Sequence, residues 1–216
     1  MAVSVLYMSM SLDGYIAGPN DTPDNPGGDG FMRLHEWFHF GEGDMTSSSS
    51  EGDSQSAEPL DAHGAVRVGP LPEEARQLVE HMEAYGAIVA GRRTVEQVDH
   101  WGGNRHGVRI FVPSHRPPDP SVTKYPLVTY VTDGIVSAMA QAKGAAGERE
   151  VLVHGAYTAQ RALEAGVLDE LQIHQIPVLF GGGRRLFELL PSRIELEIVR
   201  VIDTSEATHI RYRVRR

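Results

Sequence analysis

Four consecutive residues at positions 91–94, Gly-Arg-Arg-Thr, have the side chains of an anion-binding turn. They follow the short apolar run 87–90, which has the composition of a buried strand. A glycine allows a tight turn, and a hydroxyl residue can begin the helix that follows. Backbone N–H groups at a helix N-terminus carry partial positive charge, and two arginines add full charges. The stretch therefore predicts a site for an anionic group.

Two other segments offer acid–base or metal chemistry. Asp13 begins a turn signal with Gly14 at the end of the first apolar segment, where it can either face a ligand or cap the turn. Residues 35–39 match the H-E-x-x-H pattern, in which His35 and His39 would share one face of a helix and Glu36 would activate water. The sequence after these residues does not continue the extended motif, so zinc hydrolysis is a remote alternative and we expect no metal.

Composition restricts the ligands and the compartment. The 216 residues include 20 basic and 29 acidic side chains, which give a formal net charge of −9. This charge argues against a general binder of nucleic acid or anionic membranes, because such proteins use positive charge. A chain without cysteine forms no disulfide, thiolate metal site or cysteine nucleophile. We find no signal peptide and no apolar run of membrane-spanning length, and we expect a cytoplasmic protein.

The elements that would hold the turn at 91–94 alternate between strands and helices. Alternation of this kind implies a largely parallel sheet whose turns lie along one edge. The strands expected at 195–202 and 209–214 would pair across a turn and close the sheet with an antiparallel hairpin. The other expected strands are 3–10, 87–90, 108–113, 127–131, 150–153 and 169–177, and the expected helices are 72–85, 94–100, 135–146 and 159–166.

Two segments near the N-terminus interrupt this alternation. Residues 31–40 are rich in aromatic side chains, and they could form a short helix that lines or covers a pocket. Residues 41–64 are acidic and rich in serine, and they lack the apolar side chains that packing requires. We therefore expect one domain over residues 1–216, with a flexible insertion at about 41–64.

Six short motifs follow one another along the chain: SMSLDGYIA at 9–17, GRRT at 91–94, SHR at 114–116, HGA at 154–156, GVLDEL at 166–171 and IPVLFGGG at 176–183. In this order they resemble the dihydrofolate reductase-like family, and in particular the reductase domain of riboflavin-pathway deaminase-reductases. The resemblance covers most of residues 1–13 and 71–187 and the terminal hairpin, and residues 19–70 match only loosely. It implies a single reductase-like α/β domain with the three-layer dihydrofolate reductase-like fold, built on a mixed, mostly parallel sheet with a C-terminal antiparallel hairpin.

The resemblance also implies that the cofactor is NADPH. Arg92 and Arg93 would then hold phosphate groups, and Ser114 and Arg116 would meet the adenosine end, where a 2′-phosphate separates NADPH from NADH. Gly155 would let the backbone approach the cofactor closely, although the alanine that follows it departs from the Gly-Gly of many family members. The predicted cofactor-binding residues are Ile16, Ala17, Gly91, Arg92, Arg93, Thr94, Ser114, Arg116, His154, Gly155, Ala156, Tyr157 and Thr158.

The implied reaction is hydride transfer from NADPH to a C=N or C=O bond of a small heterocyclic or sugar-like substrate. Candidates for a catalytic role are Asp13, Glu36 and His174, but none of them aligns with a family acid. One alternative is therefore a nucleotide-binding protein of the same fold without reductase activity. The resemblance further implies a homodimer, for which the C-terminal strand pair could provide the interface, and we expect no nucleic-acid or membrane partner.

Overall fold

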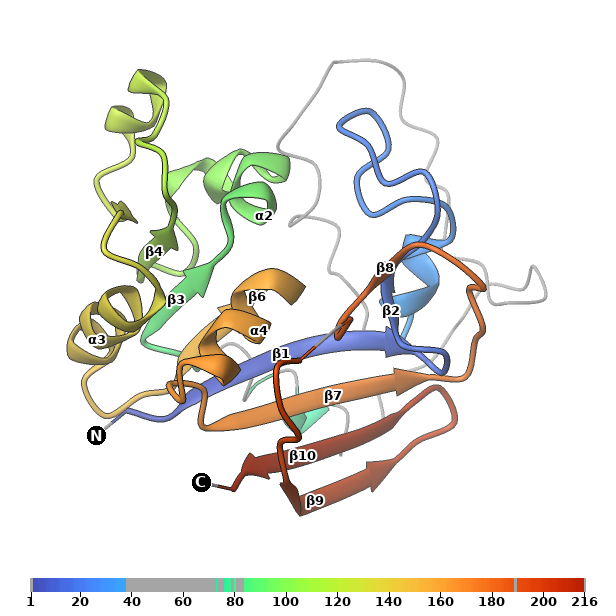
Figure 1. Ribbon diagram of the computed structural model, residues 1–216. Coiled ribbons are helices and arrows are strands. Elements are labelled where there is room, and N and C mark those ends of the chain that lie inside the picture. Colours follow the sequence, from blue (N-terminus) through green and yellow to red (C-terminus); the bar gives the residue numbers. More distant parts are fainter. Residues whose placement is uncertain are drawn as a thin grey trace.

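The computed structural model describes residues 2–37, 84–188 and 190–215, and also 73, 76–78 and 80 of the segment between the first two ranges. Its centre is a twisted sheet whose strands come from both the N-terminal and the C-terminal parts of the chain (Figure 1). The strands of this sheet are β1 (Ser4–Ser11), β3 (Ala87–Ala90), β4 (Arg109–Pro113), β5 (Val128–Val131), β6 (Val151–His154), β7 (Glu170–Ile176), β9 (Leu196–Asp203) and β10 (Thr208–Val214).

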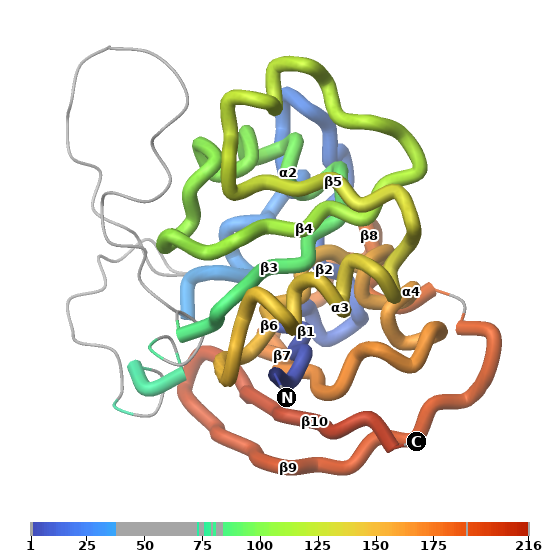
Figure 2. Tube along the Cα trace, turned by 90° about the vertical axis from the view of Figure 1, so that its left-hand side faces the viewer, coloured from blue at the N-terminus to red at the C-terminus, as the bar shows by residue number. Residues whose placement is uncertain are grey.

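The eight strands have the order β5-β4-β3-β6-β1-β7-β10-β9. Every neighbouring pair from β5 to β7 is parallel. Strand β10 pairs antiparallel with both β7 and β9, and Figure 2 shows this hairpin at one border of the sheet. The predicted mixed, mostly parallel sheet with a C-terminal antiparallel hairpin is confirmed.

A second, two-stranded sheet and several helical segments surround this centre. The small sheet pairs β2 (Tyr15–Ala17) with β8 (Arg184–Arg185), which lies in a segment that we expected to be only a glycine turn. The helices and 3₁₀ turns are η1 (Phe31–Leu34), α2 (Arg92–Gln97), η2 (Asp99–Gly103), η3 (Pro120–Lys124), α3 (Ile135–Ala146) and α4 (Ala156–Glu164). None of the helices in the described part of the chain has the length and apolar content needed to cross a bilayer.

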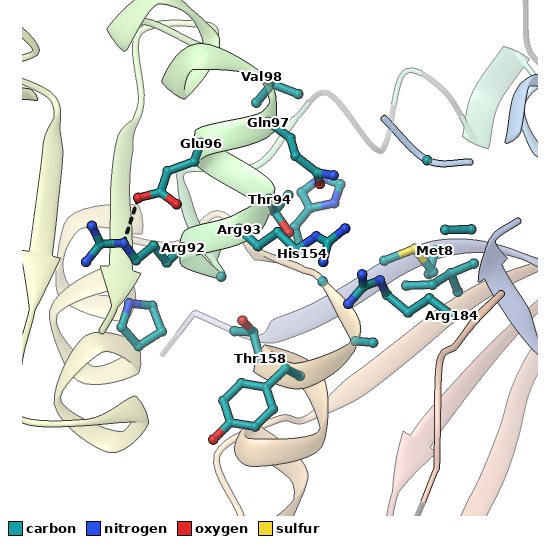
Figure 3. Close-up of a pocket in the computed structure, with 18 of the residues that line it drawn as sticks. Met8, Arg92, Arg93, Thr94, Glu96, Gln97, Val98, His154, Thr158 and Arg184 are labelled. Atoms are coloured by element: carbon teal, nitrogen blue, oxygen red, sulfur yellow. Dashed lines mark hydrogen bonds and ion pairs between the residues drawn. The ribbon is translucent and has the colours of Figure 1, made fainter. Parts of the chain in front are cut away.

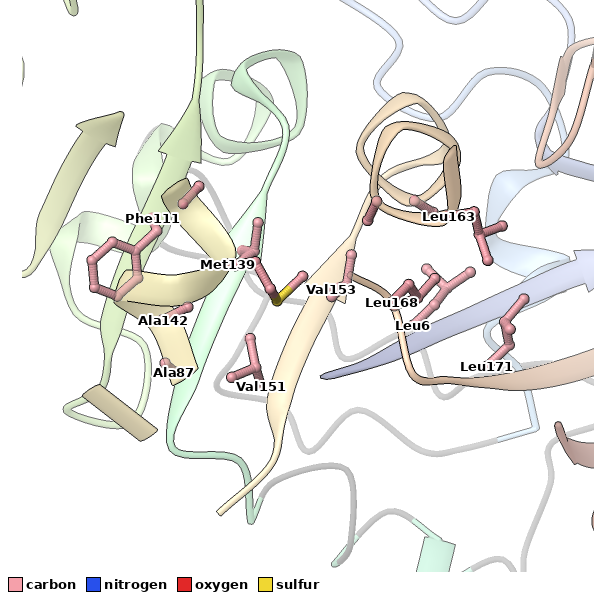
Figure 4. Packing of buried hydrophobic residues seen from close by; sticks show 14 of the residues in the cluster. Leu6, Ala87, Phe111, Met139, Ala142, Val151, Val153, Leu163, Leu168 and Leu171 are labelled. Atoms are coloured by element: carbon pink, nitrogen blue, oxygen red, sulfur yellow. The ribbon is translucent and has the colours of Figure 1, made fainter. Parts of the chain in front are cut away.

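Helices α3 and α4 cover one face of the sheet, and the packing follows from their sequences. Ala138, Ala142 and Ala146 repeat at every fourth position of α3, so this helix approaches the sheet closely. Met139 from the same helix lies against Val151 and its neighbours in the core (Figure 4). Burying a side chain such as Met139 stabilises the fold by about 1.5–3 kcal/mol.

Side chains that alternate along the strands form a second core on the other face. Ile88 and Leu152 point to this face, and Val95 from α2 packs with them. Helix α2 therefore lies on the opposite side of the sheet from α3 and α4, which gives a helix–sheet–helix arrangement. The residue types of β3 and β6 account for their central place, because β3 and the first three residues of β6 are apolar and buried on both faces.

A network of charged side chains lies on the same face as α2, farther along β7 and β10. Arg211 donates its Nε to Glu170 Oε2 and its Nη2 to Glu150 Oε1, both at 2.6 Å. The hydroxyl of Tyr7 donates to Glu150 Oε2 at 3.0 Å. Burial, followed by the charge of Glu150, raises the pKa of this tyrosine. The network joins β1, β7 and β10 to the residue that precedes β6.

Several expected element boundaries differ from the observed ones, and glycine explains the starts of two helices. Helix α2 begins at Arg92 rather than Thr94 because extended Gly91 acts as its N-cap, and Gly155 has the same role before α4. The helix expected over 31–40 is one 3₁₀ turn that ends at Leu34. The insertion expected at 41–64 and most of the helix expected at 72–85 lie outside the described residues, so those predictions stay predictions.

Candidate cofactor and substrate site

A cavity of about 1430 Å³ lies at the C-terminal ends of the parallel strands, where Gly91, Pro113 and His154 line it. Pockets for a single small ligand typically have a volume of roughly 300–1,000 Å³, so this larger cavity has room for a dinucleotide and a second small molecule. All the residues that the sequence proposed for a cofactor line the cavity: Ile16, Ala17, Gly91, Arg92, Arg93, Thr94, Ser114, Arg116, His154, Gly155, Ala156, Tyr157 and Thr158.

Two glycines and two threonines are in close contact where the turns after β3 and β6 line the cavity. A Cβ atom on Gly91 would lie 2.7 Å from Thr158 Oγ1, and one on Gly155 would lie 2.9 Å from Thr94 Oγ1. Gly155 also has a φ of +92°, a conformation that side chains other than glycine rarely adopt. Each turn therefore packs its glycine against the threonine of the other turn, and the first turns of α2 and α4 lie next to each other (Figure 3).

Three helices begin at this cavity without a side-chain cap. Gly91, Gly134 and Gly155 are the N-caps of α2, α3 and α4, and none of them provides a side-chain hydrogen bond to the helix. All three glycines line the cavity. The first N–H groups of a helix need partners from outside it, and phosphate oxygens are suitable ones. These residues thus fit the phosphate groups of a dinucleotide.

Arg92 connects α2 to the turn that follows β4. Its Nε donates to Glu96 Oε1 at 2.6 Å, and its Nη1 donates to the carbonyl oxygens of Arg116 at 3.3 Å and Pro117 at 3.0 Å. Figure 3 shows the first of these contacts. The guanidinium of exposed Arg116 has no hydrogen-bond or ion-pair partner among the residues that the structure describes. Arg116 is therefore the cation of this turn that is available to a ligand.

Asp21 and Arg184 also belong to the site, and the sequence reasoning missed both. Asp21 Oδ2 pairs with Arg93 Nη2 at 3.0 Å and with Arg184 Nη2 at 2.8 Å. In Figure 3, Arg93 and Arg184 reach toward one another from α2 and β8. Burial alone would raise the pKa of Asp21, but the hydrogen bonds from Arg184 and Gly27 and the charge of Arg93 hold it below its ordinary value.

Asp21 lies in a loop with several other acidic residues, and no spacing distinguishes it from them. The pairing of β2 with β8 brings Arg184 to it from a distant part of the chain. Arg184 follows the glycine run at 181–183, which marks a turn, but this pattern does not indicate that Arg184 pairs with Asp21.

The predicted catalytic residue Asp13 is absent from the described residues that line the cavity. Its carboxylate accepts hydrogen bonds from the Ser11 hydroxyl at 2.6 Å and from the backbone N–H groups of Phe180 at 3.1 Å and Gly181 at 2.7 Å. The bond from Ser11, and then those from the two amides, lower the pKa of Asp13 to about 2. Asp13 therefore holds two turns together and stays ionised.

Glu36 is likewise absent from the described cavity wall, and it pairs with Arg33 at 3.3 Å. His35 does line the cavity, and its Nδ1 donates to the carbonyl oxygen of Phe31 at 3.1 Å. His35 and Glu36 follow η1 in a turn, so they do not lie on a helix as the zinc pattern requires. His39 is outside the described residues, which contain no group of three side chains suited to a metal.

His174 is the one predicted catalytic residue that lines the cavity. It is buried in β7, and its Nδ1 lies 2.7 Å from the Nδ1 of His209 on β10. The ring of Trp37 stacks on it with a centroid distance of 4.3 Å. Burial, and then the charges of His209 and His35, hold the pKa of His174 well below its ordinary value, so its imidazole is neutral near pH 7.

The segment after α2 contributes an aromatic wall to the cavity. The helix expected over 94–100 ends at Gln97, so residues 99 and 100 lie in a turn, and Trp101 begins the loop that the sequence predicted. Asp99, His100 and Trp101 have φ values of 40°, 56° and 52°, so three consecutive non-glycine residues are left-handed. Such strain persists where surrounding structure enforces it, and it is common at ligand sites. The turn places Trp101 in the cavity wall, where its ring centroid lies 6.1 Å from that of His154. The guanidinium carbon of Arg105 lies over the Trp101 ring, 5.3 Å from its centroid.

A protein-family model described as the RibD C-terminal domain matches residues 4–210 of the chain. No curated protein matches the sequence significantly. Several solved structures share the fold. A protein from Shewanella sp. PV-4, described as a riboflavin biosynthesis protein, has 22% sequence identity and a TM-score of 0.65, and the match covers 100% of both chains.

Two larger proteins also contain this fold. Acinetobacter baumannii RibD has 15% identity and a TM-score of 0.56, and the match covers 100% of this chain but 58% of that one. The diaminohydroxyphosphoribosylaminopyrimidine deaminase/5-amino-6-(5-phosphoribosylamino)uracil reductase of Thermotoga maritima has 12% identity and a TM-score of 0.53, and the match covers 99% of this chain and 56% of that one. The chain therefore spans little more than half of these two proteins, and at such identities the likeness establishes the fold alone.

Proposed function

The chain belongs to the family of the RibD C-terminal domain, a reductase domain of riboflavin biosynthesis, and we propose that it is an NADPH-dependent reductase of a small heterocyclic or sugar-like compound. The observation that carries the proposal is the interlocked pair of turns around Gly91 and Gly155. They bring helix N-termini without side-chain caps to one cavity, beside Arg116, whose guanidinium has no partner in the described part of the chain. A dinucleotide with three phosphate groups is long enough to span this cavity, and its negative charges match the positive helix N-termini and the arginine.

The residues of the cavity divide into two groups with different tasks. The N-termini of α3 and α4 and the side chain of Arg116 would bind phosphates, and Ile16 and Ala17 would form the apolar wall beside the nicotinamide. When bound, the nicotinamide supplies the hydride. The aromatic side chains of Phe31 and Trp101 and the imidazoles of His35 and His174 would exclude water and orient the compound that is reduced.

Titration with NADPH and NADH, followed by thermal unfolding, tests the cofactor. At about 100 times its Kd, a ligand adds about 2.7 kcal/mol to stability, which corresponds to a rise of roughly 5–11 °C in Tm for a chain of this size. If neither cofactor changes Tm, the proposal is wrong. If NADPH binds but no pyrimidine, pterin or sugar carbonyl compound oxidises it, the alternative of a nucleotide-binding protein without reductase activity is favoured.

Arg116→Ala should lower the affinity for NADPH by about tenfold or more and change the affinity for NADH by no more than about twofold. The reason is that the guanidinium would contact only the 2′-phosphate. Isothermal titration of both cofactors measures the two affinities. Arg109→Ala is the matched control, since Arg109 is also exposed but does not line the cavity. An equal loss of NADPH and NADH affinity would refute a 2′-phosphate role for Arg116.

We also propose that the protein is a homodimer whose interface includes β9. This strand is at the edge of the sheet, and its side chains Ile198, Val199 and Val201 are 62%, 43% and 52% exposed. A long apolar edge strand promotes association with another chain, and a second copy would cover it. The cavity lies toward the other strands, so the proposed interface would leave it open.

Ile198→Asp is expected to convert this dimer to a monomer, because a carboxylate would be buried at the interface without a partner. Light scattering after size-exclusion chromatography should give twice the chain mass for the unsubstituted protein and the chain mass for the variant. Val136→Asp is the control, since Val136 is 55% exposed on α3 and away from β9. A monomeric unsubstituted protein would contradict the proposal.

A further inference from the structure

The contact between His174 and His209 limits how the two rings carry their protons. Their Nδ1 atoms are 2.7 Å apart, a distance at which one nitrogen donates and the other accepts. Both rings are buried, and burial lowers the pKa of each, so both are neutral. Each ring then has one N–H group, and the direction of the shared hydrogen bond fixes which nitrogen carries it in both residues.

Thr204 sets that direction. Its hydroxyl donates to the carbonyl oxygen of Ala207 at 2.9 Å, which uses its single proton. The same oxygen lies 3.4 Å from the Nε2 of His209, so this nitrogen must be the donor. The Nδ1 of neutral His209 is then an acceptor, and the Nδ1 of His174 donates to it. It follows that the Nε2 of His174 has no proton and presents a lone pair.

This Nε2 atom has no hydrogen-bond partner among the residues that the structure describes, although His174 is 1% exposed and lines the cavity. A buried polar nitrogen without a partner is unfavourable, and such groups are usually satisfied by a ligand or a bound water. The rings of Trp37 and Tyr7, at centroid distances of 4.3 and 6.5 Å, restrict the orientation of the imidazole. The acceptor is therefore held in place before a ligand arrives.

We propose that the Nε2 of His174 accepts a hydrogen bond from a ring N–H group of the compound that is reduced, and so selects heterocycles with a donor on that edge. The inference rests on the proposed function, and it makes His174 a specificity-determining residue rather than the proton donor. His209 and Thr204 are positioning residues, because they fix the tautomer of His174 and neither is among the described residues that line the cavity.

The tautomer is tested first, without any substrate. In ¹⁵N-histidine-labelled protein, NMR should show His174 as the form protonated at Nδ1, with the signal assigned by its loss in His174→Phe. Thr204→Val removes the acceptor for His209, so it should shift His174 toward a mixture of both tautomers. A His174 protonated at Nε2 in the unsubstituted protein would overturn the inference, whatever its NADPH affinity.

Binding to the NADPH complex is tested second, with 5,6-diaminouracil and its N1-methyl and N3-methyl derivatives as probes. One methylated probe should bind about tenfold more weakly than the parent compound, because its N–H donor is lost. His174→Phe keeps an aromatic ring in place, and it should bind 5,6-diaminouracil about tenfold more weakly. The affinities of this variant for the three probes should also differ less than those of the unsubstituted protein. If the variant discriminates as before, or if no probe binds, the inference fails, whereas unchanged NADPH binding leaves the reductase proposal intact.

Discussion

Gly91→Ala is expected to lower Tm by roughly 2–12 °C and to weaken cofactor binding by about tenfold. The added Cβ would lie 2.7 Å from Thr158 Oγ1, so the first turns of α2 and α4 must separate. Overpacking of this kind costs about 1–3 kcal/mol. Backbone strain does not contribute, because the φ of Gly91 is −65°. The expected result therefore depends on the close approach of the two turns.

Thermal unfolding with and without NADPH measures both effects, and two further variants separate their causes. Gly144→Ala is the matched control, since nothing lies within 4 Å of its Cβ position and a helical alanine is slightly more stable than glycine. Gly91→Ala combined with Thr158→Ala removes the clashing group and should recover most of the lost stability. If the single variant binds NADPH as well as the unsubstituted protein does, the interlocked turns do not form the cofactor site.

Much of the fold could be predicted because its strands carry strong local signals. The residues of β3 and the first three residues of β6 are apolar, and a helix at 135–146 has the observed bounds of α3. The two-residue strand β8 had no such signal, because its arginines pair with β2 only after the chain has folded. The starts of α2 and α4 lie before the predicted ones, since the glycine that caps each of these two helices looks like part of the preceding turn.

The site could be predicted on the side where glycines mark close backbone approaches. The turns at 91–94 and 154–158 line the cavity together, as their position after neighbouring parallel strands implies. The opposite side depends on contacts between segments far apart in the sequence. Asp21 meets Arg184 across 163 positions, and His174 meets His209 across 35, so neither partner could be inferred from local spacing.

The charged network around Arg211 is another long-range feature, and it sets the largest stability effect that we expect. Arg211→Met should lower the free energy of unfolding by about 3–5 kcal/mol, because Glu150 and Glu170 would both lose their contact with this cation while they stay largely shielded from water. The three side chains are 12%, 22% and 11% exposed in the order Arg211, Glu150 and Glu170, so water cannot replace the lost contacts fully. Denaturant unfolding measures the change.

Arg213→Met provides the control for this prediction, and a double variant tests its mechanism. Arg213 is 53% exposed and contacts Glu170 at 3.3 Å, so its loss should change stability by no more than about 1 kcal/mol. Combining Arg211→Met with Glu170→Gln removes one of the two carboxylates that lose the Arg211 contact, and it should recover part of the loss, since removing both partners of a buried pair is far less harmful than removing one. If the double variant is less stable than Arg211→Met, the loss arises from packing of the Arg211 side chain rather than from uncompensated charge.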